Sequence, residues 1–151
     1  MKKLFVIVGL VVLAGSALAQ DAMKVFKPDA LTWKPNPVFP KGAQTVILEG
    51  NPTKPGLFVI HTKFPANYRV PPHTHPVSEV VTVISGSFWN GMGEKFDAQK
   101  GELMKAGSAF VLPAKHAHYV WTTNEEVIVQ VSAVGPFGID YLNPSDDPRK
   151  K

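Results

Sequence analysis

Five histidines lie between positions 61 and 118, and three of them have the spacing of metal ligands. His73 and His75 are two residues apart, so in an extended segment both imidazoles project from the same face. Glu79 follows four residues after His75, and His118 comes later, after a proline-containing turn. Three imidazoles and one carboxylate can surround a divalent metal ion and leave positions open for water or a substrate. An isolated histidine pair would more often be incidental, so the surrounding residues decide its weight.

Two further polar residues could line a pocket beside such a site. His61 and Gln130 lie on two expected strands, and either could serve as a base or a hydrogen-bonding group behind the ligands. The alternatives are a half-buried histidine with an ordinary hydrogen bond and a glutamine that faces solvent. His116 is interpreted as a surface residue of the turn before His118, or as a gate at the pocket mouth. The sequence identifies no other catalytic residue and no substrate-binding residue.

The residues around these histidines resemble the two sequence motifs of the cupin superfamily. The first motif, G-x5-H-x-H-x3-E-x6-G, is matched at His73, His75, Glu79 and Gly86, with Asn67 in place of the leading glycine. The second motif, G-x5-P-x-G-x2-H-x3-N, is matched at Gly107, Pro113 and His118, with Lys115 in place of glycine and Thr122 in place of asparagine. Asparagine tolerates positive φ, so we expect the first turn to keep its shape. The departure at Lys115 leaves the shape of the turn before His118 open.

The resemblance covers about residues 45–135 and points to the small, exported, single-domain bacterial cupins. It implies an all-β fold, a double-stranded β-helix or jelly-roll barrel with a metal ion inside one mouth. The implied ligands are His73, His75, Glu79 and His118. One divalent transition metal ion is expected as cofactor, and Fe, Mn, Ni, Zn and Cu all suit three nitrogens and one oxygen. The alternative is a barrel that keeps the motifs and binds no metal.

Turn residues divide the rest of the chain into short segments. We expect strands at 45–49, 57–64, 79–89, 102–105, 109–112, 118–122 and 127–134, between clusters of Gly, Pro and Asn. Residues 20–44 contain four prolines, so an extended arm is expected there, with aromatic side chains packed on the body. The expected organisation is a signal peptide (1–19), a proline-rich N-terminal arm (20–44), a cupin domain (45–142) and a frayed C-terminal tail (143–151).

The first 19 residues have the pattern of an export signal. Two lysines precede an apolar run from Leu4 to Leu13, and Ala17-Leu18-Ala19 matches the small-x-small pattern, which predicts cleavage after Ala19. The run is short for a membrane span, which disfavours the alternative of an uncleaved anchor. We therefore expect a periplasmic or secreted protein with no membrane anchor after cleavage. Its metal would be acquired outside the cytoplasm, where the affinity order favours copper, zinc or nickel over manganese.

Composition excludes several classes of function. The chain has 151 residues and a formal net charge of +4, which falls to +2 once the two lysines of the signal are removed. A charge this small, on scattered basic residues, disfavours nucleic acid as a partner. The chain has no cysteine, which excludes a disulfide, a thiolate zinc site and a cysteine nucleophile.

Two functions from different classes fit these features. The first is a metal-dependent enzyme that acts on a small organic molecule, with oxygenase chemistry as the first choice on family analogy and isomerase or lyase chemistry after it. The second is a non-catalytic periplasmic protein that binds or senses a metal ion or a small ligand. Polar or titratable side chains converging near the metal would favour catalysis, and an apolar, shallow mouth would favour binding. The resemblance also suggests a homodimer, because small cupins often pair their barrels.

Overall fold

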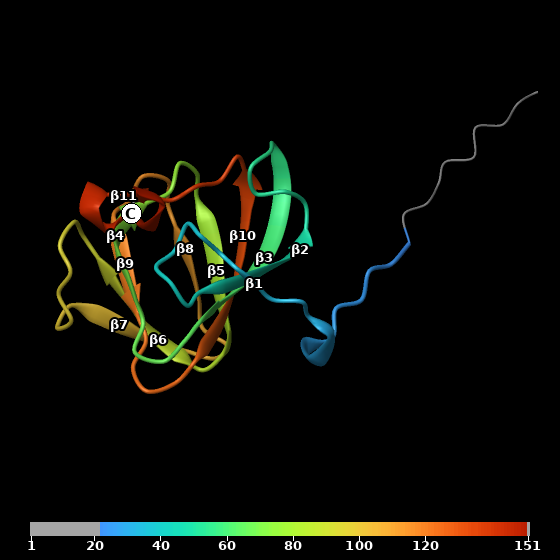
Figure 1. Ribbon diagram of the computed structural model, residues 1–151, viewed down its shortest axis with the longest axis horizontal. Coiled ribbons are helices and arrows are strands. Elements are labelled where there is room, and N and C mark those ends of the chain that lie inside the picture. Colours follow the sequence, from blue (N-terminus) through green and yellow to red (C-terminus); the bar gives the residue numbers. More distant parts are fainter. Residues whose placement is uncertain (1–21, 151) are drawn as a thin grey trace, which may run out of the picture.

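The computed structural model describes residues 22–150, so the expected signal peptide lies outside the described residues. This part of the chain is built almost entirely of short strands (Figure 1). The strands are β1 (Lys34–Pro35), β2 (Gln44–Glu49), β3 (Gly56–Phe64), β4 (Arg69–Thr74), β5 (Glu79–Ser85), β6 (Ser87–Met92), β7 (Gly101–Lys105), β8 (Ala109–Leu112), β9 (His118–Trp121), β10 (Val127–Gly135) and β11 (Asp140–Tyr141). Three 3-10 turns complete it: η1 (Pro28–Ala30), η2 (Pro144–Asp146) and η3 (Pro148–Lys150). No helix between residues 22 and 150 is long and apolar enough to cross a membrane.

The strands form two antiparallel sheets that enclose a common core (Figure 1). The six-stranded sheet has the order β1-β2-β3-β10-β5-β8, and the five-stranded sheet has the order β11-β4-β9-β6-β7. Strands far apart in the sequence are therefore neighbours, as β3 and β10 are in one sheet and β4 and β9 in the other. This arrangement of two antiparallel sheets confirms the predicted all-β jelly-roll barrel.

The segment 79–89, predicted as one strand, is divided at Gly86 into two strands. The segment ends in the six-stranded sheet as β5 and resumes in the five-stranded sheet as β6. Gly86 has a φ of +70°, and a Cβ atom at this position would lie 2.2 Å from the backbone oxygen of Glu126. Only glycine fits such a position, so the motif glycine is the point where the chain crosses between sheets.

Alternation along β3 and β10 decides which side chains reach the barrel interior. Ile60, Thr62 and Phe64 of β3 are buried, whereas the residues between them are only half-buried on the outer face of the sheet. The partner strand β10 repeats this pattern, with Val129 and Val131 buried. Because successive side chains point to opposite faces, only the first set can line the interior.

The N-terminal arm is tied to the edge of the six-stranded sheet. Its residues Lys34–Pro35 form the edge strand β1, where a proline costs no hydrogen bond of the sheet. Two aromatic residues of the arm, Trp33 and Phe39, pack on the body, as expected. The Trp33 ring lies 4.6 Å from the Nζ atom of Lys63, and Phe39 packs edge-on against Phe64 with ring centroids 5.4 Å apart. The arm therefore forms part of the wall of the barrel.

The C-terminal segment is folded against the barrel, so the prediction of a frayed tail is wrong. Arg149 pairs with both carboxylate oxygens of Asp147 at 2.7 and 2.9 Å, and its Nη2 atom donates to the backbone oxygen of Ile139. Asp147 is only 6% exposed, and the Arg149 guanidinium holds the pKa of its carboxyl below the usual range. Sequence composition could not reveal this pairing, because the carbonyl that anchors it belongs to another segment.

Thr122 connects the end of β9 to the loop that precedes β4. Its hydroxyl accepts from the backbone nitrogen of Tyr68 at 2.9 Å and donates to the backbone oxygen of Pro65 at 2.6 Å. The side chain is 5% exposed. A threonine at the position of the motif asparagine therefore still links the strand to this loop.

Replacing Thr122 by valine should destabilise the barrel by about 2–3 kcal/mol, because it leaves a buried N–H group and a buried carbonyl without partners. Denaturant unfolding followed by fluorescence measures the change. Thr82→Val, on the outer face of β5, is the matched control and should stay within about 0.5 kcal/mol of the parent. Equal effects of the two substitutions would contradict the role given to Thr122.

Candidate metal centre

Three histidines of the predicted site meet inside the barrel. His73 lies in β4, His75 directly follows that strand, and His118 begins β9, where it is the register partner of His73. All three are buried, with exposures of 2 to 4%. One potential ligand atom from each lies within 4.8 Å of the others. The adjacent strands β4 and β9 thus place the three imidazoles in one group.

The Nδ1 atom of each imidazole faces a hydrogen-bond acceptor. His73 Nδ1 donates to the backbone oxygen of Pro71 at 2.7 Å, and His75 Nδ1 donates to that of Gly138 at 2.7 Å. His118 Nδ1 donates to the side-chain oxygen of Asn90 at 3.1 Å. With the proton on Nδ1, the Nε2 atom of each neutral ring keeps its lone pair free, which is the tautomer a metal ion requires.

The free Nε2 atoms of His75 and His118 lie only 3.2 Å apart. Two lone pairs at this distance repel each other unless a cation or a proton lies between them. Burial lowers the pKa of both rings, and for His118 the neighbouring histidines lower it further. A shared proton is therefore disfavoured, and a divalent cation fits this donor set.

Glu79 approaches the three histidines from the opposite sheet. It begins β5, and its Oε1 atom lies 3.5 Å from His75 Nε2 and 4.0 Å from His118 Nε2. The side chain is 4% exposed, and this burial raises the pKa of its carboxyl to about 8. A cation beside it would favour the ionised form and reverse that shift. The structure thus brings together all four residues that the sequence proposed as ligands.

His61 and Gln130 lie on the outer face of the six-stranded sheet, which corrects their candidacy as pocket residues. They are register partners on β3 and β10, and His61 Nε2 lies 3.2 Å from Gln130 Oε1. Their strand neighbours Ile60, Thr62 and Val129 line the interior instead. Alternation in the sequence defines the two faces of β3 and β10, but it does not indicate which of the two faces turns inward. His116 is exposed in the turn before β9.

The turn before His118 keeps the backbone shape that the second motif requires. Lys115 has a φ of 62°, and Asn67, at the first glycine position of the motifs, has a φ of 55°. The backbone nitrogen of Lys115 donates to the backbone oxygen of His75 at 2.8 Å, which links this turn to the first motif. The left-handed conformation costs a non-glycine residue about 1–2 kcal/mol, and Lys115 adopts it three residues before His118.

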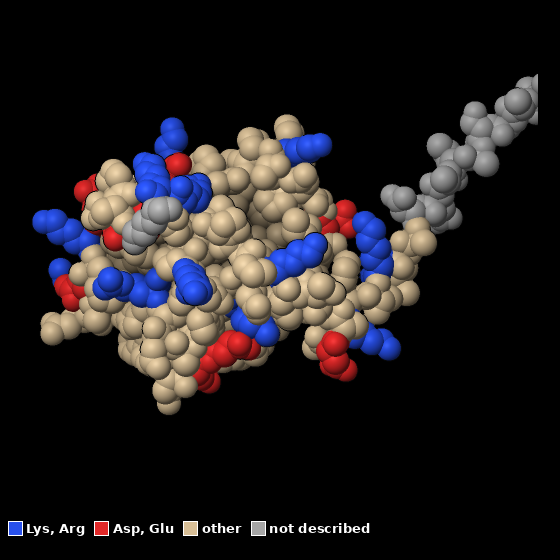
Figure 2. Space-filling view, in the orientation of Figure 1, with Lys and Arg blue, Asp and Glu red and all other residues tan. Residues whose placement is uncertain are grey.

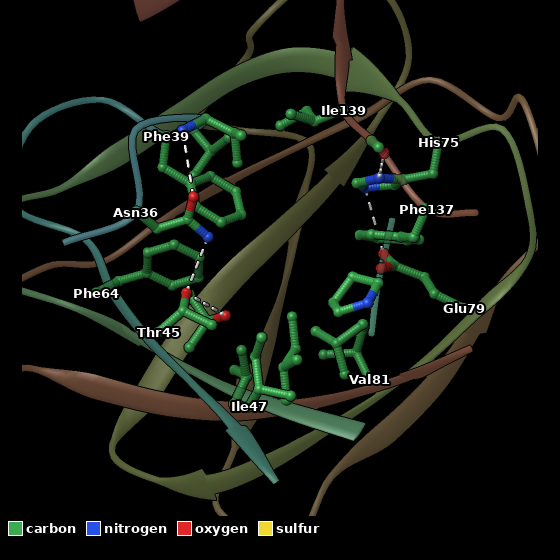
Figure 3. Close-up of a pocket in the computed structure, with 18 of the residues that line it drawn as sticks. Asn36, Phe39, Thr45, Ile47, Phe64, His75, Glu79, Val81, Phe137 and Ile139 are labelled. Atoms are coloured by element: carbon green, nitrogen blue, oxygen red, sulfur yellow. Dashed lines mark hydrogen bonds and ion pairs between the residues drawn. The ribbon is translucent and has the colours of Figure 1, made fainter. Parts of the chain in front are cut away.

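The candidate metal centre, formed by His73, His75, His118 and Glu79, opens into a cavity of about 940 Å³ between the two sheets (Figure 3). Its walls are mostly aromatic and branched aliphatic side chains, among them Phe39, Phe64, Phe88, Phe110, Phe137, Val81 and Ile139. Phe137 stacks on the His75 ring with centroids 4.7 Å apart and planes 12° apart. No local sequence pattern points to a role for Phe137 or Asn90, because their contacts with the histidines depend on chain segments far apart in sequence.

Fold and site together define a jelly-roll barrel with a buried group of three histidines that could hold a metal ion inside it. A family model described as Cupin matches residues 39–136, well over half of the chain. The chain belongs to the cupin family, whose members commonly bind a metal ion. A search of curated protein sequences found no match. The suggested homodimer stays a prediction.

Solved structures share the barrel at low sequence identity. The polyketide cyclase RemF from Streptomyces resistomycificus has a TM-score of 0.68 and 19% identity, over 85% of this chain and 92% of its own. An RmlC-like cupin protein from Ralstonia eutropha has a TM-score of 0.62 and 19% identity, over 83% of this chain and 76% of its own. A sugar phosphate isomerase of the cupin superfamily from Silicibacter pomeroyi has a TM-score of 0.58 and 16% identity, over 74% and 76%. At these identities the likeness shows the fold alone.

The metal-free protein should be most stable near neutral pH. Below pH 6.5 the histidines gain protons only when unfolded, because burial lowers the pKa of His73 to about 3 and also lowers those of His75 and His118. Unfolding is therefore favoured as the pH falls. Between pH 4.5 and about 8 the Glu79 carboxyl loses its proton only when unfolded, so above pH 6.5 stability falls as the pH rises.

Thermal unfolding of chelator-treated protein across this pH range measures the effect. Glu79→Gln replaces the carboxyl by a neutral group of similar shape, so the variant should keep its melting temperature between pH 6.5 and 8 while the parent declines. A parallel decline in both proteins would contradict the role given to Glu79.

Proposed function

We propose that this protein is a metal-dependent enzyme that acts on a small organic molecule inside the barrel. The observation that carries the proposal is the set of Nε2 atoms with free lone pairs, two of them 3.2 Å apart, beside a buried carboxyl. The cavity that opens from this group provides room for a substrate. Two neighbours in fold are named as a cyclase and an isomerase, which supports catalysis as the use of this barrel.

The four ligand candidates would hold one divalent transition metal ion. His73, His75 and His118 would bind as neutral imidazoles and Glu79 as a carboxylate. When bound, a redox-active ion such as iron or copper supplies oxygen chemistry, and zinc or nickel supplies Lewis-acid chemistry. Oxygenase activity is our first choice, and isomerase or lyase activity follows it.

The chain's own contribution is to exclude water and orient the substrate. A substrate packed against the apolar walls would displace water, which would strengthen electrostatic interactions at the metal end of the cavity. With His61 on the outer face and Glu79 used as a ligand, no further histidine or carboxyl among the residues that line the described part of the cavity could exchange a proton.

One observation favours the second candidate function, a protein that binds or senses a metal ion or small ligand without turnover. The ionisable residues that line the cavity, apart from the four ligand candidates, are Lys34 and Arg149. Lys34 is exposed, and Arg149 is paired with Asp147. No separate acid–base pair therefore stands in the described part of the cavity, and turnover has to be measured.

His75→Ala should abolish most metal binding while the barrel stays folded, because it removes one ligand and leaves the aliphatic core untouched. His116→Ala is the matched control, since His116 is exposed and does not line the cavity. Calorimetric titration of the metal-free proteins with Zn²⁺ measures the loss, expected to exceed about 100-fold. Equal affinities of the two variants would remove the site assignment.

Oxygen uptake by the iron- or copper-loaded protein, with a panel of small phenols and enols, tests the oxygenase choice. Turnover that disappears in His75→Ala but persists in His116→Ala is the expected result. A protein that binds one metal ion per chain and turns over no compound, with oxygen or without it, would favour the binding function instead.

We further propose that the protein is exported to the periplasm or beyond. The support is the sequence of residues 1–19, with two lysines, an apolar run and a small-x-small end. Cell fractionation followed by N-terminal sequencing should recover a mature chain that begins at Gln20 outside the cytoplasm. Recovery of the uncleaved chain from the cytoplasm would contradict this proposal.

A further inference from the structure

A second polar group lies in the cavity, away from the metal centre. Asn36 Nδ2 donates to Thr45 Oγ1 at 3.0 Å, and Thr45 Oγ1 shares a hydrogen bond with Thr62 Oγ1 at 3.3 Å. We call these three residues the threonine cluster. They come from the arm, β2 and β3, and all of them line the cavity. Figure 3 shows Asn36 and Thr45 on one side of the cavity, with His75 and Glu79 on the other.

The threonine cluster has hydrogen-bond donors to spare. Two hydroxyl groups share one hydrogen bond, so one of their two protons is left over. The Asn36 amide has two N–H groups, of which one donates to Thr45, while its oxygen accepts from the backbone nitrogen of Val38. The cluster can therefore offer two donors, one hydroxyl and one amide N–H, to an oxygen atom of a ligand.

The distance between the threonine cluster and the metal centre exceeds the length of one aromatic ring. Thr45 lies on β2 and Glu79 on β5, which are three strand spacings apart in the order β2-β3-β10-β5. Three spacings correspond to about 14 Å along the sheet, before both side chains extend into the cavity. A ligand that touches both ends must be longer than one ring, and a volume of about 940 Å³ accommodates such a molecule.

The wall between the two ends is apolar and rich in aromatic rings. Phe39, Phe64 and Phe137 line it, together with branched residues such as Ile47 and Val81 (Figure 3). Phe39 and Phe64 meet edge to face at 5.4 Å beside the threonine cluster, and Phe137 lies at the metal end. Such rings pack favourably against the faces and edges of an aromatic ligand.

The cavity does not suit an anionic ligand. Its two cationic lining residues are Lys34, which is exposed, and Arg149, which already pairs with the Asp147 carboxylate. Lys34 is the register partner of Thr45, but it is exposed, so its charge is screened by solvent. A phosphate or carboxylate buried at the threonine cluster would therefore lose its hydration for a weak counter-charge, which is costly.

We propose that the cavity takes an uncharged aromatic molecule of two or more rings with an oxygen substituent at each end. One oxygen lies at the metal centre and the other accepts hydrogen bonds from the threonine cluster. The metal end of this assignment rests on the proposed function, whereas the opposite end rests on Asn36, Thr45 and Thr62 alone. These three are binding residues that set the length and polarity of the substrate.

Calorimetric titration with two matched probes tests the proposal. The probes are 4,4′-dihydroxybiphenyl, with an oxygen at both ends, and 4-hydroxybiphenyl, with an oxygen at one end. The zinc-loaded protein should bind the two-oxygen probe more tightly. Thr45→Val should weaken that probe about tenfold, since it removes the central hydroxyl of the cluster, and should leave the one-oxygen probe within about twofold. Thr45→Ser should restore the affinity, and Thr82→Val, on the outer face, should change nothing.

The outcomes separate this proposal from the metal assignment. Identical binding by zinc-loaded and metal-free protein, with the Thr45 effect intact, would contradict the metal end and leave the threonine cluster in place. Equal loss of both probes in Thr45→Val, or no loss of either, would overturn the role of the cluster. Absence of binding by both biphenyls, or tighter binding of glucose 6-phosphate, would overturn the substrate class.

Discussion

The hydrogen bonds that the three Nδ1–H groups donate are the constraint on which the site depends. Each fixes a neutral imidazole with its proton away from the centre, so that the Nε2 lone pairs of His73, His75 and His118 remain free. The acceptors are two backbone carbonyls and the Asn90 side chain. Without these acceptors, the buried rings could turn or change tautomer, and the repulsion between His75 and His118 would be relieved without a cation. The candidate metal centre therefore depends on these hydrogen-bond acceptors as much as on the ligand candidates.

The order of strands in the barrel places these acceptors next to the histidines. Pro71 lies on β4, Asn90 on β6 and Gly138 on the segment before β11, and these strands are assembled in one sheet. Glu79 comes from the facing sheet, so the centre bridges both layers. Lys115 keeps a left-handed backbone that costs free energy, next to a strand that carries a ligand candidate. The left-handed conformation of Lys115 lowers the stability of the fold, and it shapes the turn that leads into His118.

The ligand candidates and the barrel could be predicted from the sequence because both leave local patterns. The spacing of His73, His75 and Glu79 puts them in one motif, and the turn residues divide the chain into strands. The strand β4 was not expected, since Pro71 and Pro72 argue against a strand inside a sheet. The structure accommodates both prolines at an irregularity in the pairing of β4 with β9, between Val70 and His73.

The rest of the site depends on contacts that no local pattern contains. Alternation gave two faces for β3, but only the packed barrel shows that Thr62 faces inward and His61 outward. The threonine cluster forms only where the arm meets β2 and β3. The C-terminal segment is anchored by the hydrogen bond from Arg149 to the backbone oxygen of Ile139. Asn90 lies just beyond the strand expected at 79–89, yet it belongs to β6 and accepts a hydrogen bond from His118 on the neighbouring strand β9. Polar residues that act through tertiary partners look like ordinary strand or turn residues in the sequence.

Elemental analysis of the mature protein, purified without a histidine tag from the compartment where it occurs, tests the central claim most directly. The hydrogen-bonded imidazoles and the buried carboxyl lead us to expect about one divalent transition metal ion per chain. This ion should be lost in His75→Ala and kept in His116→Ala. A protein that carries no metal and takes up none from Fe²⁺, Mn²⁺, Ni²⁺, Zn²⁺ or Cu²⁺ would contradict it.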